Sequence, residues 1–371
     1  MTGDGQGQAN KKERAVKRIF GKWTVLLMVG IVAVVAVGAS TASVGKKAAG
    51  GDICVLLPDT ATSIRWVHYD APALKAAFKA AGVSAQFYNA DQDAQKQVSQ
   101  ANQCLGNGAK VLIEVALDAG SAATIEKTAK AKGVPSIDYD RQTKGGVASI
   151  YVSFDGGAVG ILQGKGLIAA LKASGKYSQH PVIAELNGGS TDANSFLFKG
   201  GYDKILKPLY KNGTFKKGPD QFVPEWDNQK AATIFDQMLV KTGNKIDGVV
   251  AANDGIASSV VADLQKHGLK PIPLTGQDAT PQGLQYIIAG WQSMTVWKDT
   301  RVLAKAAAAA AIALLNGNTP KTTGTVPNGS LKEPAFIIPP VMVTKANWRK
   351  LYTGGFLKKS DICNGAYKKY C

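Results

Sequence analysis

The segment Val134-Pro135-Ser136-Ile137-Asp138-Tyr139-Asp140-Arg141 is a short apolar stretch that runs directly into charged side chains. Its first half has the character of a buried strand, and the polar residues begin where that strand would end. In open α/β sheets, ligands bind in the crevice beyond the carboxyl ends of the strands. Asp140 supplies hydrogen-bond acceptors and Arg141 a planar set of donors. The segment therefore suits a ligand with neighbouring hydroxyl groups; the alternative is a surface ion pair in a loop.

Strand and helix patterns alternate on both sides of this segment. The predicted strands are Ile53–Leu57, Val83–Tyr88, Val111–Val115, Val134–Asp138, Ile150–Phe154, Val182–Leu186, Asp247–Ala251, Pro271–Thr275, Ser293–Trp297 and Ala335–Ile338. The predicted helices include Ala71–Ala81, Asp91–Leu105, Ser121–Lys132, Asp155–Ala173, Asn194–Tyr210, Asn228–Thr242, Asp254–His267 and Thr300–Leu315. Such alternation indicates parallel sheets with helices on both faces. Since 371 residues are enough for two ordinary domains, we expect an α/β fold of two units joined by several crossings.

The N-terminal region has the pattern of an export segment. Basic residues up to Lys22 precede an uncharged stretch with the apolar block Val25–Val37 at its centre. This is the layout of a secretory signal, with a small-residue cleavage site at Val37-Gly38-Ala39 or Ser40-Thr41-Ala42. The stretch is also nearly long enough to span a bilayer, so a retained anchor is the alternative. Either reading assigns residues 1–49 to a signal peptide or membrane anchor and predicts an extracytoplasmic location for the rest.

The four cysteines fit an exported protein, because oxidising compartments favour disulfides. Cys363 and Cys371 are close in sequence and are predicted to pair, which leaves Cys54 to pair with Cys104. No C-x-x-C motif is present and the three histidines are scattered, so the sequence does not predict a zinc site.

The distribution of charge argues against a nucleic-acid-binding protein, and the absence of catalytic motifs argues against an enzyme. A net charge of +17 would suit a nucleic-acid partner, but the lysines and arginines after residue 49 are scattered, and we expect no nucleic acid. Neither a G-x-x-x-x-G-K-[ST] phosphate loop nor a G-x-S-x-G elbow occurs. His267 precedes Gly268 at a predicted helix end, which indicates a capping role. We therefore expect a protein that is not an enzyme and uses no cofactor.

Polar or aromatic side chains recur just past the predicted strand ends. They offer flat apolar rings or paired donors and acceptors, which suit the C–H face and the hydroxyls of a pyranose. The candidate ligand-binding residues are Arg65, Trp66, Asp140, Arg141, Asn194, Trp226, Asn253, Asp278 and Lys298. A structural role is the alternative for each one, since Asp or Asn after a strand often caps a helix and Trp often packs in a core. We expect Asp254 to be such a cap.

At these residues the chain resembles the type I periplasmic sugar-binding proteins of ABC importers, and within that family the group that binds D-xylose. The resemblance extends from about residue 53 to residue 343. It is carried by the segments Arg65-Trp66, Tyr139-Asp140-Arg141, Tyr151–Asp155, Asn253-Asp254, Gly276–Ala279 and Met294–Lys298. It implies two Rossmann-like parallel-sheet lobes joined by a hinge that the chain crosses three times, near Ser153, Lys298 and Leu331. The N-terminal lobe would be residues 50–153 with 299–331, and the C-terminal lobe 154–298 with 332–371.

The resemblance also implies roles for the candidate residues. Trp66 and Trp226 would sandwich the sugar ring. The first lobe would bind hydroxyls through Arg65, Asp140 and Arg141, and the second through Asn194, Asn253, Asp278 and Lys298. The loop Pro58–Ile64 is less charged than its family equivalent, which leaves the exact sugar open, and the C-terminal tail looks additional.

The function implied is capture of a monosaccharide, D-xylose or a related aldose, by a monomer that closes around it and delivers it to an ABC permease. The alternative is a sensor that presents its closed form to a membrane chemoreceptor or histidine kinase. A sugar-modifying enzyme is a third class, against which the missing acid/base signature argues.

Overall fold

The computed structural model describes residues 51–60 and 63–371, and its larger sheet contains seven strands. In spatial order these are β10 (Gly324–Asn328), β11 (Leu331–Ile338), β5 (Ile150–Phe154), β4 (Ser136–Tyr139), β3 (Val111–Glu114), β1 (Ile53–Leu57) and β2 (Ala85–Asn89). All neighbours are parallel except β10 and β11, which pair antiparallel. We refer to this sheet and its helices as the first lobe.

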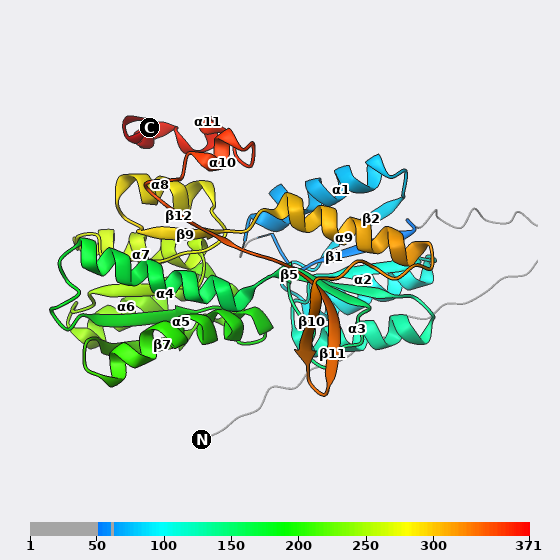
Figure 1. Cartoon of the computed structure of the whole chain (residues 1–371), viewed down its shortest axis with the longest axis horizontal. Helices are drawn as coiled ribbons and strands as arrows, with labels where there is room; N and C mark the ends of the chain where they lie inside the picture. Colours follow the sequence, from blue (N-terminus) through cyan, green and yellow to red (C-terminus); the bar gives the residue numbers. More distant parts are fainter. Residues whose placement is uncertain (1–50, 61–62) are drawn as a thin grey trace, which may run out of the picture. The chain divides into compact units, whose positions relative to one another are not determined.

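Helices cover both faces of this sheet, as its buried strands require. Side chains of β1 alternate between two cores: Ile53, Val55 and Leu57 pack with α1 (Ala71–Ala80) and α9 (Thr300–Leu315), whereas Cys54 and Leu56 pack with α2 (Ala94–Gly106) and α3 (Ala119–Ala131). Successive residues of a strand point to opposite faces, so the two helix pairs lie on opposite sides of the sheet (Figure 1). A short helix, η1 (Trp66–Asp70), precedes α1 with π-helical hydrogen bonds, a geometry that is frequent at functional sites.

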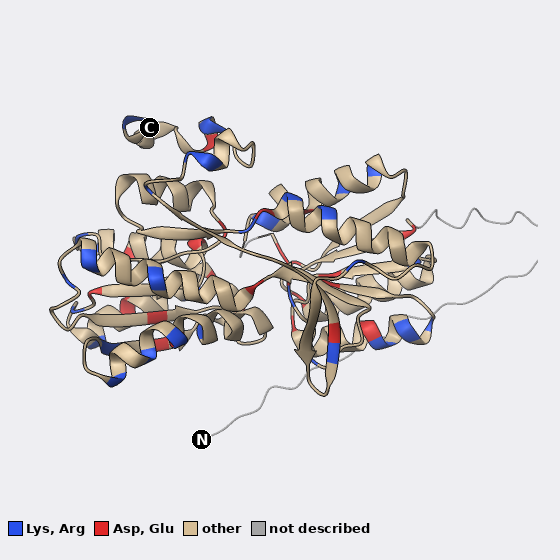
Figure 2. Ribbon diagram, viewed as in Figure 1, with Lys and Arg blue, Asp and Glu red and all other residues tan. Residues whose placement is uncertain are grey.

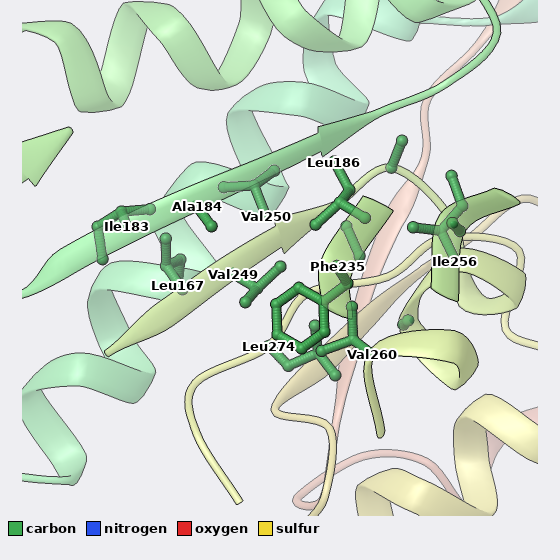
Figure 3. Close-up of a cluster of buried hydrophobic side chains, with 14 of the residues drawn as sticks. Leu167, Ile183, Ala184, Leu186, Phe235, Val249, Val250, Ile256, Val260 and Leu274 are labelled. Atoms are coloured by element: carbon green, nitrogen blue, oxygen red, sulfur yellow. The ribbon is translucent and has the colours of Figure 1, made fainter. Parts of the chain in front are cut away.

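The second lobe contains a three-stranded parallel sheet and a separate antiparallel pair. The sheet has the order β7 (Lys216–Phe222), β6 (Val182–Asn187) and β8 (Gly248–Ala251), and the pair is β12 (Val341–Thr344) with β9 (Met294–Trp297). The accompanying helices are α4 (Gly156–Ala173), α5 (Ala193–Lys211), η2 (Pro224–Trp226), α6 (Asn228–Thr242), α7 (Asp254–Lys266) and α8 (Pro281–Ala289). Branched apolar side chains of β6 and β8 pack against these helices in one continuous core (Figure 3).

The alternation of helices and strands is confirmed, and the differences have local causes. The predicted strand Pro271–Thr275 is reduced to a single bridge between Leu274 and Val249, because Pro271 and Pro273 have no N–H to donate to a ladder. The helix predicted to begin at Asp91 begins at Ala94 instead, since Asp91 has a φ of 51° and Asp93 is the N-cap.

One predicted lobe boundary is wrong. The sequence analysis places residues 332–338 in the second lobe, but Ala335 to Ile338 pair in parallel with Tyr151 to Phe154 of β5. Within residues 63–371, the chain therefore passes between the lobes after β5, after β9 and after β11, the last between Ile338 and Val341. The first two residues of β11 are exposed. This explains why the sequence pattern predicts only the second half of the strand, Ala335–Ile338.

The predicted disulfides are confirmed. Cys54 of β1 is joined to Cys104 of α2, and Cys363 is joined to Cys371. The second bridge encloses η3 (Gly365–Tyr370), which follows α10 (Lys350–Thr353) and α11 (Lys359–Ile362) in the C-terminal segment. Lysines and arginines are spread over helices of both lobes and over this segment (Figure 2).

The predicted export segment lies outside the described residues. Within the part of the chain that the structure does describe, no helix has the length and apolar character needed to cross a membrane.

Buried carboxyl groups gather at the side of β4 that faces α3 and the β10–β11 hairpin. Burial, together with the nearby Glu126 and Glu333, raises the pKa of Asp138 well above its ordinary value. Burial likewise raises the pKa of Glu333 to about 7, although Gln142 and Asn328 donate hydrogen bonds to its carboxylate at 3.0 and 3.1 Å. A carboxyl group with a raised pKa keeps its proton in the folded protein at pH values where the unfolded chain has lost it, so stability falls as pH rises through that range.

We therefore predict that Glu333→Gln reduces the loss of stability between pH 5 and pH 8 by on the order of 2 kcal/mol. The amide keeps the hydrogen-bonding shape of the side chain but cannot acquire the charge. Urea unfolding at both pH values checks this, with the exposed Glu225→Gln as control. Equal pH dependence in wild type and Glu333→Gln would contradict it.

Candidate functional site

A small cavity lies between the two lobes. Both lobes line it, and the lining includes all nine candidate residues, Arg65, Trp66, Asp140, Arg141, Asn194, Trp226, Asn253, Asp278 and Lys298. The structure therefore brings together every residue that the sequence analysis selected, from segments more than 200 positions apart. The described residues form one compact unit, and the contacts below join its lobes.

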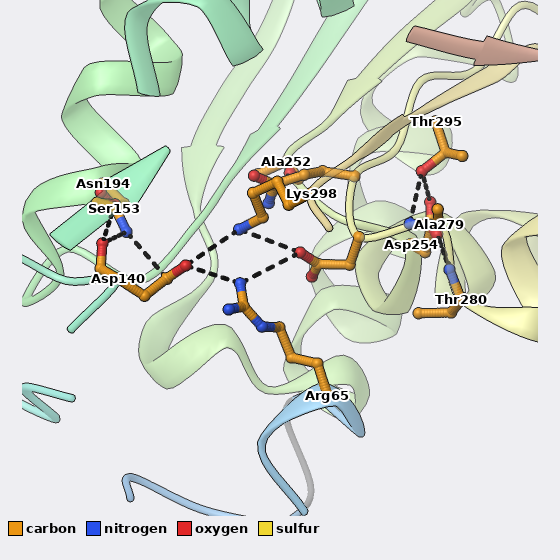
Figure 4. Close-up of polar contacts among 12 residues, drawn as sticks. Arg65, Asp140, Ser153, Asn194, Ala252, Asp254, Ala279, Thr280, Thr295 and Lys298 are labelled. Atoms are coloured by element: carbon orange, nitrogen blue, oxygen red, sulfur yellow. Dashed lines mark hydrogen bonds and ion pairs between the residues drawn. The ribbon is translucent and has the colours of Figure 1, made fainter. Parts of the chain in front are cut away.

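A network of alternating charges crosses the cavity. The Arg65 guanidinium lies 2.8 Å from the Asp140 carboxylate and 3.9 Å from that of Asp278, and the Lys298 ammonium lies 3.7 and 3.2 Å from the same two groups (Figure 4). All four side chains are at most 7% exposed. Hydrogen bonds with a charged partner are about twice as strong as neutral ones, and each of these groups has capacity for further bonds. The network can thus donate to and accept from hydroxyl groups within one small space.

Two groups behind the cavity fix the position of Arg65. Asp70, at the end of η1, accepts from Nε and Nη2 of Arg65 at 2.9 and 2.8 Å, and from the Tyr139 hydroxyl at 2.6 Å. This fork-to-carboxylate geometry leaves Nη1 directed to Asp140. Burial alone would raise the pKa of Asp140, but Arg65 and Lys298 outweigh it and hold that pKa below its ordinary value. Asp140 is therefore an ionised acceptor at neutral pH.

The backbone of Asp140 is an equally important feature. Its φ is 65°, in the left-handed region. Its carbonyl oxygen accepts three hydrogen bonds, from the Ser153 hydroxyl at 2.7 Å, the Tyr151 hydroxyl at 3.0 Å and the Asn194 amide at 3.0 Å (Figure 4). Two of the donors belong to β5 of the first lobe and the third to α5 of the second. One carbonyl thus connects both lobes beside the hinge.

Arg141 pairs with a carboxylate of the second lobe. Its Nε lies 2.9 Å from Asp192. The same carboxylate accepts from the Trp226 indole at 3.1 Å and from the backbone N–H of Asn194 at 2.9 Å. Burial raises the pKa of Asp192 more than the charge of Arg141 lowers it. The alternative of an exposed surface ion pair is wrong, since Arg141 is only 6% exposed.

The two tryptophans come from opposite lobes and are both buried, Trp66 at 2% and Trp226 at 6% exposure. The Arg65 guanidinium lies 4.3 Å from the ring centroid of Trp66. The indole N–H of Trp66 is buried without a hydrogen-bond partner. Trp226 occupies the space above Gly188, where any Cβ would come within 2.2 Å of its ring. Glycine at position 188 is thus required for this ring to reach the cavity.

Several lining residues have unusual backbone conformations. Asp140, Trp226 and Asp278 have φ values of 65°, 59° and 94°. Such conformations are uncommon for residues other than glycine and cluster at ligand sites, where surrounding structure holds them. The sequence contains no signal for them at these positions.

The expected helix cap at Asp254 is wrong. Asn253 is the N-cap of α7 and accepts from the N–H of Ile256 at 2.9 Å, while it also lines the cavity. Asp254 is buried in the first turn, where it accepts from Thr280, Gln292 and Thr295, and burial raises its pKa to about 7. The expected cap at His267 is confirmed at the end of α7.

Four further lining residues were not selected from the sequence: Ser63, Asp192, Phe198 and Gln277. Gln277 follows a predicted strand end and could have been included on the same reasoning as Asp278. Asp192 has the sequence context of an ordinary N-cap, and it is the N-cap of α5. Its ion pair with Arg141 could therefore not be predicted from the sequence. Among the described residues, no cluster of three or more His, Cys, Asp or Glu is arranged to hold a metal ion.

Comparison with known proteins agrees with this geometry. Residues 53–319 match the family model described as a periplasmic binding protein domain. The D-xylose-binding periplasmic protein of Escherichia coli (strain K12) is 35% identical over 277 residues, which cover 74% of this chain and 82% of that protein. The multiple sugar-binding periplasmic receptor ChvE of Rhizobium radiobacter is 32% identical over 330 residues, covering 84% and 92%.

A solved structure extends the likeness to three dimensions. The carbohydrate transporter solute-binding protein of Chloroflexus aurantiacus, solved in complex with D-glucose, is 29% identical, with a TM-score of 0.76 over 84% of this chain and 98% of that one. The relatives named here are sugar-binding or solute-binding proteins, not enzymes. With a family model over more than half of its length and relatives above 30% identity, the chain belongs to the periplasmic binding protein family, and its fold is that of type I.

Proposed function

We propose that this protein captures a monosaccharide outside the cytoplasm and delivers it, as a monomer, to an ABC permease in the membrane. The observation that carries the proposal is the set of buried donors and acceptors that line one small cavity together with Trp66 and Trp226, contributed by both lobes. Hydroxyls of a sugar would bind Arg65, Asp140 and Lys298. Its C–H faces would pack on the rings of Trp66 and Trp226.

Binding would be coupled to closure of the two lobes. The contacts of Asp140 with Lys298 and Asn194, and of Arg141 with Asp192, join the lobes, so they exist only when the lobes are close together. A ligand shifts a protein toward the conformation in which it gains more contacts. A sugar held by both lobes would therefore favour the closed form, which a permease could recognise.

D-xylose or a related aldose is the proposed ligand. Support comes from the relatives: one is named for D-xylose, another for multiple sugars, and a structural neighbour was solved with D-glucose. A sensory role is the second candidate, because one relative is named a receptor. In that role the closed form would bind a chemoreceptor or histidine kinase instead of a permease.

A thermal-shift panel of pentoses and hexoses tests the proposal. A ligand at 100 times its dissociation constant stabilises the folded state by about 2.7 kcal/mol, so D-xylose or another aldose should raise the melting temperature by several degrees. Amino acids and polyamines serve as controls that should give no shift. A shift with one of these controls, and none with any sugar, would contradict the proposal.

Arg141→Ala should weaken sugar binding about 10- to 100-fold, because a hydrogen bond to a charged group contributes roughly 1.5–3 kcal/mol. The loss also leaves Asp192 buried without its cation. Arg141→Lys keeps the charge but not the fork of donors and should recover only part of the affinity. Isothermal titration calorimetry measures both variants, with circular dichroism to verify the fold. An unchanged dissociation constant in Arg141→Ala would remove this residue from the site.

A further inference from the structure

The C-terminal strap, defined here as residues 345–371, is fastened to the second lobe. Trp348, Leu351 and Ile362 of the strap are buried against apolar side chains of α8. The Gln285 amide of α8 donates to the carbonyl of Ile362 at 3.1 Å, and Tyr367 packs edge-on against Tyr286 at 6.4 Å between ring centroids. Together with the Cys363–Cys371 disulfide, these contacts give the strap a fixed base.

The same strap also contacts the first lobe. The ring of Phe356 stacks on Tyr69 of η1, with centroids 5.5 Å apart and planes 27° apart. Arg301, in the first turn of α9, donates to the Gly354 carbonyl at 2.8 Å, and its guanidinium lies 5.6 Å from the Phe356 ring. Burial and the Asp361 carboxylate of the strap raise the pKa of the Tyr69 phenol to about 12.

The two aromatic neighbours of Phe356, Tyr69 and Trp297, adjoin residues of the cavity. Tyr69 lies three residues after Trp66 and four after Arg65, within or beside η1. On the other side, Trp297 contacts Phe356 at 5.4 Å between centroids and immediately precedes Lys298. Phe356, which is 8% exposed, thus lies between the segment that carries Arg65 and Trp66 and the strand that ends just before Lys298.

We propose that the C-terminal strap holds the two lobes in the closed arrangement, with Phe356 as the residue that positions η1 against β9. The proposal rests on the proposed function. Opening would separate Phe356 and Gly354 from Tyr69 and Arg301, because these belong to the other lobe, while the contacts of the strap with α8 would persist. The strap therefore favours closure without contacting the ligand, and it slows release of the sugar.

Stopped-flow measurement of sugar dissociation tests the strap. Phe356→Ala should release the sugar about 2- to 10-fold faster than wild type, the range expected for the loss of one aromatic pair. Phe356→Trp keeps a ring and should restore slow release, and Phe356→Leu is a substitute if the alanine variant does not fold. Tyr370→Ala is the matched control, since this aromatic ring of the strap is 39% exposed and its loss should leave the release rate unchanged.

Hydrogen exchange of the sugar-free proteins provides a second readout. Amides of Trp66–Asp70 should exchange faster in Phe356→Ala than in wild type and Tyr370→Ala. If Phe356→Ala releases sugar and exchanges these amides at wild-type rates, the strap is only a packing element and the proposal is overturned. If wild type binds no sugar, the proposed function fails, and the exchange rates alone decide the role of the strap.

Discussion

Asp140 is the residue on which the arrangement of the site depends. Its carboxylate lies between Arg65 of the first lobe and Lys298 at the end of β9. Its carbonyl oxygen accepts from Tyr151 and Ser153 on one side of the hinge and from Asn194 on the other. A left-handed backbone conformation lets one residue serve both directions. Because buried charges and buried carbonyls are costly without partners, the position of Asp140 restrains the side chains of both lobes.

The cavity is lined mainly by charged and polar side chains. These include three cations and three carboxylates, namely Arg65, Arg141, Lys298, Asp140, Asp192 and Asp278. Pairing among buried charges only roughly compensates the loss of water. Hydroxyl groups of a sugar can bond to such groups without adding charge, and flat rings beside them can cover its apolar faces. This combination explains how one cavity could bind a neutral, hydroxyl-rich molecule with specificity.

Much of the fold was predictable from the sequence, because apolar runs such as Ile53–Leu57 and Val111–Ile113 mark parallel strands buried on both faces. The candidate residues were predictable for a related reason: the carboxyl ends of parallel strands converge, so polar residues after those ends meet. Pairing choices were not predictable. Nothing in the sequence indicates that Arg141 pairs with Asp192 rather than Asp140, or that β11 pairs with β5. Nor does it indicate that Asn253 is the N-cap of α7 while Asp254 is buried in the first turn. Each of these depends on contacts between distant segments. The role of Phe356 is of the same kind, because it depends on Tyr69, nearly 290 positions earlier.

A crystal structure of the protein with D-xylose or another stabilising aldose tests the central claim most directly. The account predicts that the sugar lies between the rings of Trp66 and Trp226, with hydroxyls within hydrogen-bond distance of Arg65, Asp140 and Lys298. A sugar bound elsewhere, or held by one lobe alone with the tryptophans apart, would contradict it.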